Sequence, residues 1–250
     1  EIKKRDVILE IGPGRGALTE KLLENAGLVV AVEKDRELLE FLQNKFEKEI
    51  KQRSLVLVHD DILQFEITNY ELRNYKIIAN IPYNITGAIL KKFLTETNQP
   101  ELMVLMVQHE VAQRIIASPR HGGASGKESV LSISVKAYGT PKMVAKVDKR
   151  YFSPAPKVNS AIIKISNINR KIFTSPQPSP YKGEGGIIDE EKFWEIVKAG
   201  FAHKRKKLAS NLKNLQKDGS LASVLELGNK RAEDLTLSDW ISLANVKVQP

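Results

Sequence analysis

The chain has 250 residues, and 39 lysines and arginines against 30 aspartates and glutamates give a formal net charge of +9. It contains no cysteine, which excludes disulfides, cysteine-ligated zinc, iron–sulfur clusters and thiol catalysis. The four histidines lack metal-ligand spacing, and no apolar run approaches the roughly 20 residues of a membrane-spanning helix. We therefore expect a cytoplasmic protein without a metal or membrane partner, and the surplus positive charge weakly suggests nucleic acid.

The first half of the chain alternates short apolar runs with amphipathic stretches. This alternation predicts βαβ units and a mainly parallel sheet. Strand-like runs occupy residues 7–11, 28–32, 55–59, 76–79 and 102–108, and helical spacing occupies 17–25 and 35–50. Two later runs, 143–147 and 161–165, predict an antiparallel pair at one edge of the sheet.

A change in composition divides the chain into two domains. Residues 174–186 hold three of the 11 prolines and three of the 15 glycines, without an apolar period. Such a segment is typical of a flexible linker or a surface insertion. We expect a cofactor-binding catalytic domain over residues 1–166, a linker or insertion over 167–188, and a helical RNA-binding domain over 189–250.

A glycine-rich turn, residues 12–16, follows the first predicted strand and precedes a helix. Glycine allows a tight turn and lets a ligand approach the backbone. Gly12, Gly14 and Ala17 also fit the dinucleotide fingerprint, and Glu33 ends the second strand where a ribose-binding acid belongs. The turn predicts an adenosine-containing cofactor and leaves its identity open; the plain alternative is a turn without a ligand.

Acidic residues stand at the ends of three successive strands, namely Glu10, Glu33 and the pair Asp60 and Asp61. Open α/β sheets bind ligands in the crevice at these ends. The acids would repel the pyrophosphate of NAD, whereas S-adenosylmethionine has no phosphate and carries cationic sulfonium and ammonium groups. They therefore favour S-adenosylmethionine. Either aspartate could instead cap the following turn, and we favour Asp61 as the cofactor contact.

The sequence Asn80-Ile81-Pro82-Tyr83 comes directly after the fourth predicted strand. An exocyclic amine on a purine has a delocalised lone pair, so its methylation needs positioned hydrogen-bond acceptors. The Asn80 side-chain carbonyl and the rigid backbone carbonyl beside Pro82 are such acceptors, and Tyr83 can stack on an extruded base. The plain alternative is a proline turn with a packed tyrosine.

At this point the chain resembles a known family. EIGPGRGALT, AVEKD, HDD and NIPYNIT stand in the order of the S-adenosylmethionine-dependent adenine methyltransferases. YFSPAPKVNS, residues 151–160, is similar to the FxPxPKVxS segment of the ribosomal RNA adenine dimethylase family. The resemblance implies that Phe152 helps to hold the target base, although a core aromatic is the alternative. Lys157 would contact phosphate.

Residues 196–217 contain seven basic side chains and no acid. Phe201, Leu208, Leu212 and Leu215 give this run an apolar stripe, which predicts an amphipathic helix with a phosphate-binding basic face. FAHKRKKLASNL also resembles the FxxRRKxLxNxL segment of the family. The RNA-binding candidates in this run are Lys204, Arg205, Lys206 and Lys207.

The resemblance is to the KsgA-type small-subunit ribosomal RNA dimethyltransferases, over residues 6 to 245 without the linker. It implies a Rossmann-like methyltransferase fold with a smaller C-terminal helical domain. It also implies direct methylation of two adjacent adenines in the 3′-terminal hairpin loop of 16S RNA, during small-subunit biogenesis. The implied cofactor contacts are Gly12, Glu33, Asp61 and Asn80, to which the strand-end acids and the glycine turn add Glu10 and Gly14 as predicted cofactor-binding residues. The implied base contacts are Asn80, Pro82, Tyr83 and Phe152.

Several alternatives stay open from the sequence. The nearest is the large-subunit ribosomal RNA adenine dimethylase, followed by DNA adenine or protein glutamine methyltransferases with a related Asn-Pro-Pro-Tyr turn. A non-catalytic assembly factor for immature small subunits is an alternative from another class. An NAD oxidoreductase is more distant, because it gives Asn80 to Tyr83 no role. We expect the protein to act as a monomer on ribosomal RNA or on immature 30S-type subunits.

Overall fold

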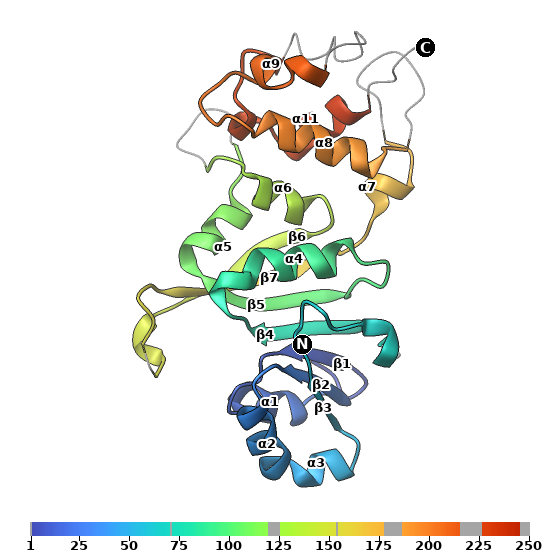
Figure 1. Cartoon of the computed structure of the whole chain (residues 1–250), viewed down its shortest axis with the longest axis vertical. Helices are drawn as coiled ribbons and strands as arrows, with labels where there is room; N and C mark the ends of the chain where they lie inside the picture. The colour runs from blue at the N-terminus through green and yellow to red at the C-terminus, as the bar shows by residue number, and fades with distance from the viewer. Residues whose placement is uncertain are drawn as a thin grey trace. The chain divides into compact units, whose positions relative to one another are not determined.

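The computed structural model describes residues 2–70, 72–119, 126–153, 155–177, 187–215 and 227–245, without the Asn69 side chain. The chain forms two compact units (Figure 1). The first contains Glu1–Ala112 and Gly139–Ile168, and the second contains Gln113–Tyr138 and Asn169–Pro250. We describe each unit by itself.

The first unit is built on a sheet of seven strands among the described residues, in the order β3-β2-β1-β4-β5-β7-β6. The strands are β1 Val7–Ile11, β2 Leu28–Glu33, β3 Leu55–His59, β4 Tyr75–Asn80, β5 Leu102–Gln108, β6 Thr140–Val147 and β7 Ser160–Ser166. β1 to β5 pair in parallel, while β7 pairs antiparallel with both β5 and β6. The predicted parallel sheet and its late antiparallel pair are both confirmed.

Helices lie against this sheet (Figure 1). They are α1 Ala17–Leu23, α2 Arg36–Lys45, α3 Glu47–Lys51, α4 Thr86–Thr95 and the start of α5 His109–Ile116. On α4, Ile89, Leu90 and Phe93 are fully buried. Parallel strands that are covered on both faces have nearly continuous apolar sequences, which explains why β1 and β2 can be recognised from the sequence.

The prediction of one helix over residues 35–50 is wrong, because the helix is interrupted at Phe46, between α2 and α3. The Phe46 backbone leaves helical geometry, with φ −114° and ψ 29°. Its ring is 5% exposed and packs with Leu42 in the core cluster around Ile8 and Val29. Burial of this ring outweighs the continuous helical periodicity.

The second unit has its own aromatic core. Its helices are α6 Val130–Lys136, α7 Lys171–Thr174, α8 Glu190–Gly200, α9 Leu208–Asn211 and α11 Leu237–Ala244. The Tyr138 ring contacts Phe173 and Trp194, and Phe173 contacts Phe193. The Tyr138 hydroxyl donates to the Glu190 carboxylate and accepts from Trp194 Nε1 at 3.2 Å.

These contacts explain why the compact units differ from the expected division after residue 166. Residues 113–138 lie with the C-terminal residues rather than with the sheet. The expected linker, 167–188, includes helix α7 with the buried Phe173. Its residues 178–186 lie outside the described part of the chain.

The prediction of a continuous basic helix through residues 196–217 is also wrong. Helix α8 ends at Gly200, and residues 201–207 form turns before α9. Asn211 Nδ2 donates to the carbonyls of Gly200 at 2.5 Å and His203 at 3.1 Å, which satisfies groups that a longer helix would use. The turn directs Leu208 and Leu212 into the core, where both are fully buried.

Candidate active site

The glycine-rich turn after β1 has a left-handed backbone at three positions. The φ angles are 64° at Gly12, 59° at Gly14 and 77° at Gly16, values that side-chain-bearing residues rarely adopt. A Cβ on Gly12 or Gly14 would meet no atom within 4 Å, whereas a Cβ on Gly16 would lie 2.5 Å from the Phe46 ring. The first two glycines therefore border open space that suits a ligand, and the third allows packing.

Glu33 fixes this turn to the end of β2. Its Oε2 accepts from the Gly14 backbone N–H at 3.1 Å, and its Oε1 accepts from the Asp35 N–H at 2.9 Å. The side chain is buried, and the carbonyl of the preceding residue, Val32, accepts from the Gly12 N–H at 3.0 Å. Sequence reasoning placed Glu33 beside the glycine turn, and the structure brings the two together.

Glu10 is the most deeply buried acid of this region, at 1% exposure. Burial raises the pKa of its carboxyl to about 7; the Glu33 charge adds to the rise, and the Thr19 hydroxyl opposes it. Glu10 Oε2 has no hydrogen-bond partner among the described residues. A buried, unsatisfied carboxyl beside open glycines fits a cationic ligand such as S-adenosylmethionine.

Asp61 carries two interactions at the end of β3. Its Oδ1 accepts from the Leu63 N–H at 3.0 Å, and its Oδ2 accepts from Lys34 Nζ at 2.9 Å. The lysine lowers the pKa of the Asp61 carboxyl. Asp61 thus forms the Asx turn that we gave as the alternative, while Asp60 Oδ1 accepts from the Asp61 N–H at 2.7 Å. Cofactor contact by Asp61 stays a prediction.

A cavity of about 260 Å³ opens at the end of β4. Its lining residues are Asn80, Ile81, Pro82, Tyr83, Phe152 and Pro156. All four predicted base-binding residues therefore meet at one cavity, although Phe152 comes from the connection between β6 and β7. Pro156 was not among the predicted site residues, and its signal was the second proline of the FSPAP segment.

The turn after β4 is held by short-range hydrogen bonds and by one contact from β7. Thr86 Oγ1 donates to the Tyr83 carbonyl at 3.1 Å, and the Ile85 N–H donates to the Pro82 carbonyl at 3.3 Å. The Tyr83 Oη and Ser160 Oγ atoms share a hydrogen bond of 2.7 Å. Ser160 is fully buried, and sequence reasoning missed it because no spacing rule links a serine to a distant tyrosine.

The cavity combines acceptors with flat rings. Asn80 is exposed at the strand end and supplies an amide oxygen, while Tyr83 and Phe152 are half-buried aromatic walls. Ile81 is buried and anchors the turn. An open, partly aromatic pocket with neutral acceptors can hold a planar base and accept hydrogen bonds from its amine.

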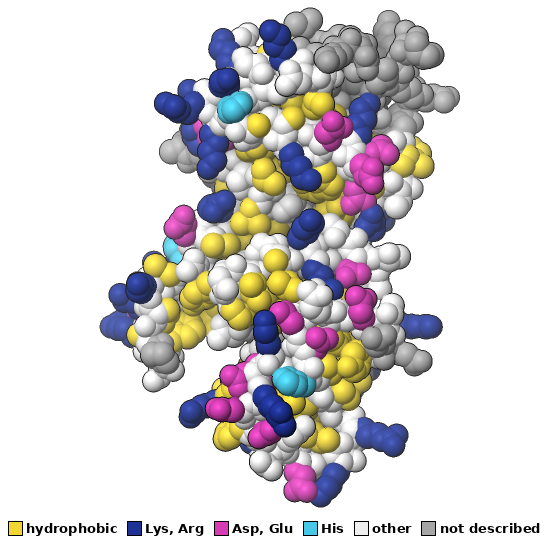
Figure 2. Space-filling view, in the orientation of Figure 1, with side chains coloured by type: hydrophobic (Ala, Val, Ile, Leu, Met, Phe, Trp, Pro, Cys, Tyr) yellow, Lys and Arg dark blue, Asp and Glu magenta, His cyan; other side chains and the backbone are white. Residues whose placement is uncertain are grey.

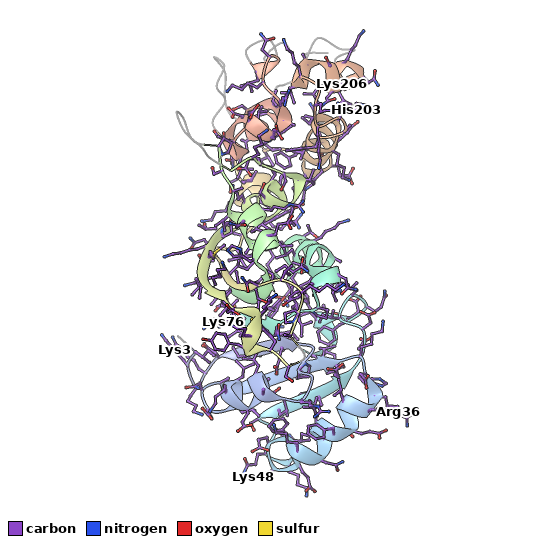
Figure 3. All side chains as sticks on the ribbon, turned by 90° about the vertical axis from the view of Figure 1, so that its left-hand side faces the viewer. Lys3, Arg36, Lys48, Lys76, His203 and Lys206 are labelled. Atoms are coloured by element: carbon purple, nitrogen blue, oxygen red, sulfur yellow. The ribbon has the colours of Figure 1, made fainter. Side chains whose placement is uncertain are left out.

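The predicted RNA-binding cations are all exposed. Lys157 belongs to the first unit, and Lys204 to Lys207 belong to the turn between α8 and α9 in the second. Figure 3 labels His203 and Lys206 in this turn, where the Lys206 N–H donates to the His203 carbonyl at 3.0 Å. An exposed basic turn can contact phosphates just as the expected basic face of a helix would.

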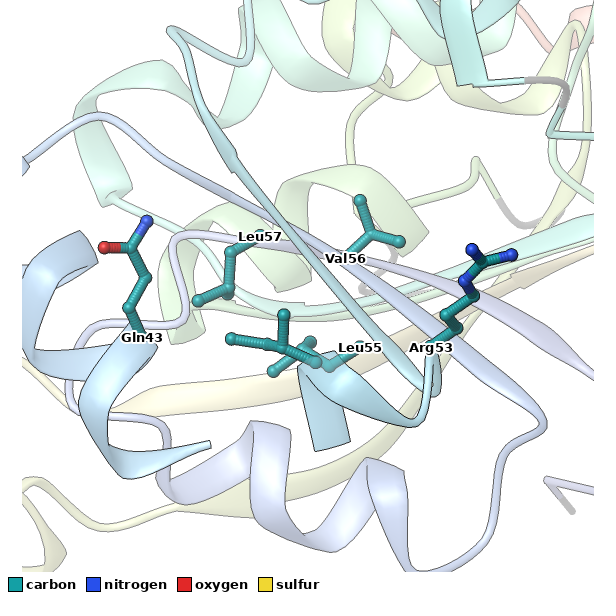
Figure 4. Close-up of a pocket in the computed structure, with 6 residues that line it drawn as sticks. Gln43, Arg53, Leu55, Val56 and Leu57 are labelled. Atoms are coloured by element: carbon teal, nitrogen blue, oxygen red, sulfur yellow. The ribbon is translucent and has the colours of Figure 1, made fainter. Parts of the chain in front are cut away.

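A larger cavity, of about 410 Å³, lies beside edge strand β3 (Figure 4). It is lined by Gln43, Ile50, Arg53, Leu55, Val56 and Leu57, and by none of the predicted site residues. Within the described ranges, no group of three or more acidic or histidine side chains could hold a metal ion. No helix of the described part is long and apolar enough to cross a membrane.

Comparison with known proteins gives consistent matches. Residues 1–249 match the family described as ribosomal RNA adenine dimethylase. The chain is 36% identical to "Ribosomal RNA small subunit methyltransferase A" of Dehalococcoides mccartyi (strain ATCC BAA-2266 / KCTC 15142 / 195), covering 98% of this chain and 80% of that protein. It is also 36% identical to the protein of that name from Thermosynechococcus vestitus, covering 98% of this chain and 88% of the relative.

Two solved structures share the architecture. A dimethyladenosine transferase from Plasmodium falciparum matches with a TM-score of 0.77 and 24% identity, covering 97% of this chain and 90% of that one. The 23S rRNA methyltransferase ErmE matches with a TM-score of 0.69 and 24% identity, covering 97% and 91%. These likenesses confirm the predicted Rossmann-like methyltransferase fold.

Proposed function

The chain belongs to the ribosomal RNA adenine dimethylase family, and on that basis we propose that it dimethylates two adjacent adenines in the 3′-terminal hairpin loop of 16S RNA. Its activity is S-adenosylmethionine-dependent adenine dimethylation of small-subunit ribosomal RNA. Relatives named for the small subunit, at 36% identity or more, favour this RNA over the large-subunit alternative. An rRNA substrate also supports action in the cytoplasm.

The proposed cofactor site lies around the glycine-rich turn. S-adenosylmethionine, when bound, supplies a methyl group on a positively charged sulfur. Gly12 and Gly14 leave room beside the backbone, and the proposed role of Glu33, next to this turn, is to accept from the ribose hydroxyls. Glu10 offers the buried negative charge, and Asp61 offers a carboxylate oxygen that Lys34 now holds.

The proposed base site is the 260 Å³ cavity, and the meeting of its four predicted residues supports the assignment best. The Asn80 amide oxygen and the backbone carbonyl before Pro82 accept from the adenine amine, which exposes the nitrogen lone pair for attack. Tyr83 and Phe152 hold the base by stacking. The monomethylated amine then returns to the same cavity for the second transfer.

The RNA itself is proposed to contact cations outside the cavity. Lys157 on the first unit and Lys204, Arg205, Lys206 and Lys207 on the second are exposed, which supports contact with phosphates. These contacts would orient the loop without reading its sequence.

The test supplies purified protein and labelled S-adenosylmethionine to small subunits that lack the modification. Digestion to nucleosides should yield labelled dimethyladenosine, and mapping should place it at two adjacent adenines of the 3′-terminal loop. Large subunits treated in parallel should stay unlabelled. Absence of dimethyladenosine would overturn the proposal, and a catalytically dead variant that still rescues subunit maturation would favour an assembly role.

A further inference from the structure

The connection between β6 and β7 displays an unusual amount of apolar surface. Tyr151 is 82% exposed, the highest value among the large hydrophobic side chains of the described residues. Val158 of the same connection is 45% exposed, and Val144 of the preceding strand β6 is 58% exposed. This connection projects from the sheet in Figure 1, and Figure 2 shows hydrophobic and basic side chains intermixed on it. Exposed apolar surface rimmed by charge marks an interaction site.

The turn that carries Tyr151 has a defined conformation. Residues Lys149–Tyr151 form one 3-10 turn, capped by Asp148 Oδ1, which accepts from the Arg150 N–H at 2.9 Å. The Lys149 N–H donates to Asn159 Oδ1 at 3.0 Å, which ties the turn to the strand that returns. The aromatic ring is thus presented on an ordered turn, which lowers the entropy lost when a partner binds.

The charge around Tyr151 favours an anionic partner. Between residues 142 and 158 there are five basic side chains, and Asp148 is the single acid. Arg150 Nε pairs with the Asp148 carboxylate at 3.0 Å, so these two opposite charges offset each other. Lys142, Lys146, Lys149 and Lys157 are exposed, and no ion pair is recorded for them within the described ranges.

Tyr151 is adjacent to Phe152, which lines the cavity with Asn80. The turn that displays Tyr151 therefore lies next to the cavity in which the target adenine is proposed to bind. An exposed ring among cations is the combination that binds single-stranded nucleic acid, because bases stack on the ring and phosphates meet the lysines. An acidic protein surface could use the charges, but it would not require a flat exposed ring.

We propose that Tyr151 forms a second base-binding subsite, which stacks on the unpaired nucleobase beside the target adenine while Lys149 contacts its phosphate. This inference rests on the proposed function, since it takes the target base to occupy the Asn80 cavity. The subsite selects an extruded, single-stranded segment, because only unstacked bases can occupy both positions.

The test measures binding to a fluorescein-labelled hairpin RNA with two adjacent loop adenines, at one fixed salt concentration. Two further RNAs lack the base on the 5′ or the 3′ side of the adenine pair. The proteins are the wild type, Tyr151→Ala, Tyr151→Phe and Phe41→Ala. Phe41 is the control because it is an aromatic residue on α2, 47% exposed, in the same unit.

Tyr151→Ala should weaken binding of the complete RNA roughly 5- to 150-fold, the range for loss of one stacked base. Tyr151→Phe and Phe41→Ala should bind like the wild type. For the wild type, removal of one of the two flanking bases should weaken RNA binding. For Tyr151→Ala, removal of that same base should leave the affinity unchanged, because the ring and the base act as a pair.

The subsite would be overturned if each of the two abasic RNAs lost as much affinity for the wild type as for Tyr151→Ala. So would a defect of Tyr151→Ala that appears with whole small subunits and not with the hairpin, which would point to a protein partner. The proposed function is tested separately: it fails if the wild-type protein forms no dimethyladenosine on small subunits.

Discussion

At the scale of single residues, Glu10 couples protonation to folding. Its pKa rises from 4.5 to about 7 on burial, so the folded chain binds more protons than the unfolded chain between these two pH values. The stability of the protein therefore falls as pH rises through this window and is level above it. A bound cationic cofactor would offset the cost of the buried charge.

Glu10→Gln should remove this pH dependence. At pH 8 the variant should be more stable than the wild type by up to about 3 kcal/mol, and at pH 4 the two should be equal. Urea denaturation without cofactor at both pH values measures the difference. Glu20→Gln, at an exposed acid of α1, is the control and should change neither value. An equal gain at both pH values would contradict the assignment to the Glu10 charge.

Asn80 is placed to act on the reacting amine rather than on RNA affinity. Asn80→Ala should lower methyl transfer roughly 100-fold or more, since a lost positioned hydrogen bond costs that much in comparable sites. Its RNA affinity should stay near that of the wild type. Asn84→Ala, at an exposed asparagine four residues later, is the matched control. Parallel loss of binding and transfer would instead make Asn80 structural.

Ser160 acts on the base site through Tyr83, because their hydroxyls share the 2.7 Å hydrogen bond. Ser160→Ala and Tyr83→Phe should each lower kcat/KM. The double variant should lose no more than the larger single loss, because either change removes the same bond. If the fold losses of kcat/KM in the two single variants instead multiply in the double variant, the coupling is contradicted. The denaturation midpoints of the three variants show whether lower stability accounts for the loss of activity.

At the scale of elements, the strands were predictable and the helix ends were not. β3 and β5 have the bounds predicted from their apolar runs, 55–59 and 102–108. The breaks at Phe46 and Gly200 depend on tertiary packing, which periodicity does not record. A Cβ at Gly200 would lie 2.4 Å from the Trp240 ring, far away in the sequence.

The features of the candidate site also fall into those that the sequence predicts and those that it does not. The glycine turn, the strand-end acids and Asn80 to Tyr83 follow from local motifs, and Phe152 follows from resemblance to the family. The Tyr83 to Ser160 hydrogen bond and the unsatisfied oxygen of Glu10 depend on distances across the sheet. No local pattern contains those distances.

Gly16 shows how one element limits another, because the glycine turn packs directly on the Phe46 ring. Gly16→Ala should destabilise the protein by about 1–3 kcal/mol through overpacking and the strained positive φ. Gly87→Ala, where a Cβ meets no atom within 4 Å, should be neutral or slightly stabilising in helix α4. Chemical denaturation of both variants makes the comparison, and an undestabilised Gly16→Ala would contradict it.

At the scale of the whole molecule, the net charge of +9 is unevenly distributed. Acids lie at the strand ends of the proposed cofactor site, and exposed cations gather in the turn between α8 and α9. The distribution suits an enzyme that binds a cationic cofactor and a polyanionic substrate. It also predicts that RNA affinity depends on particular cations more than on total charge.

Replacement of Lys204, Lys206 and Lys207 by Gln tests this, with Arg36, Lys48 and Lys51 changed to Gln as the control. Each triple variant has a net charge of +6, from 9 − 3. Figure 3 labels Arg36 and Lys48 on the first unit. The slope of log affinity against log salt should fall by about 2 to 3 for the turn variant, because each lost phosphate contact removes roughly 0.7 to 0.9. The control slope should hardly change, and equal losses would mean that diffuse charge alone attracts the RNA.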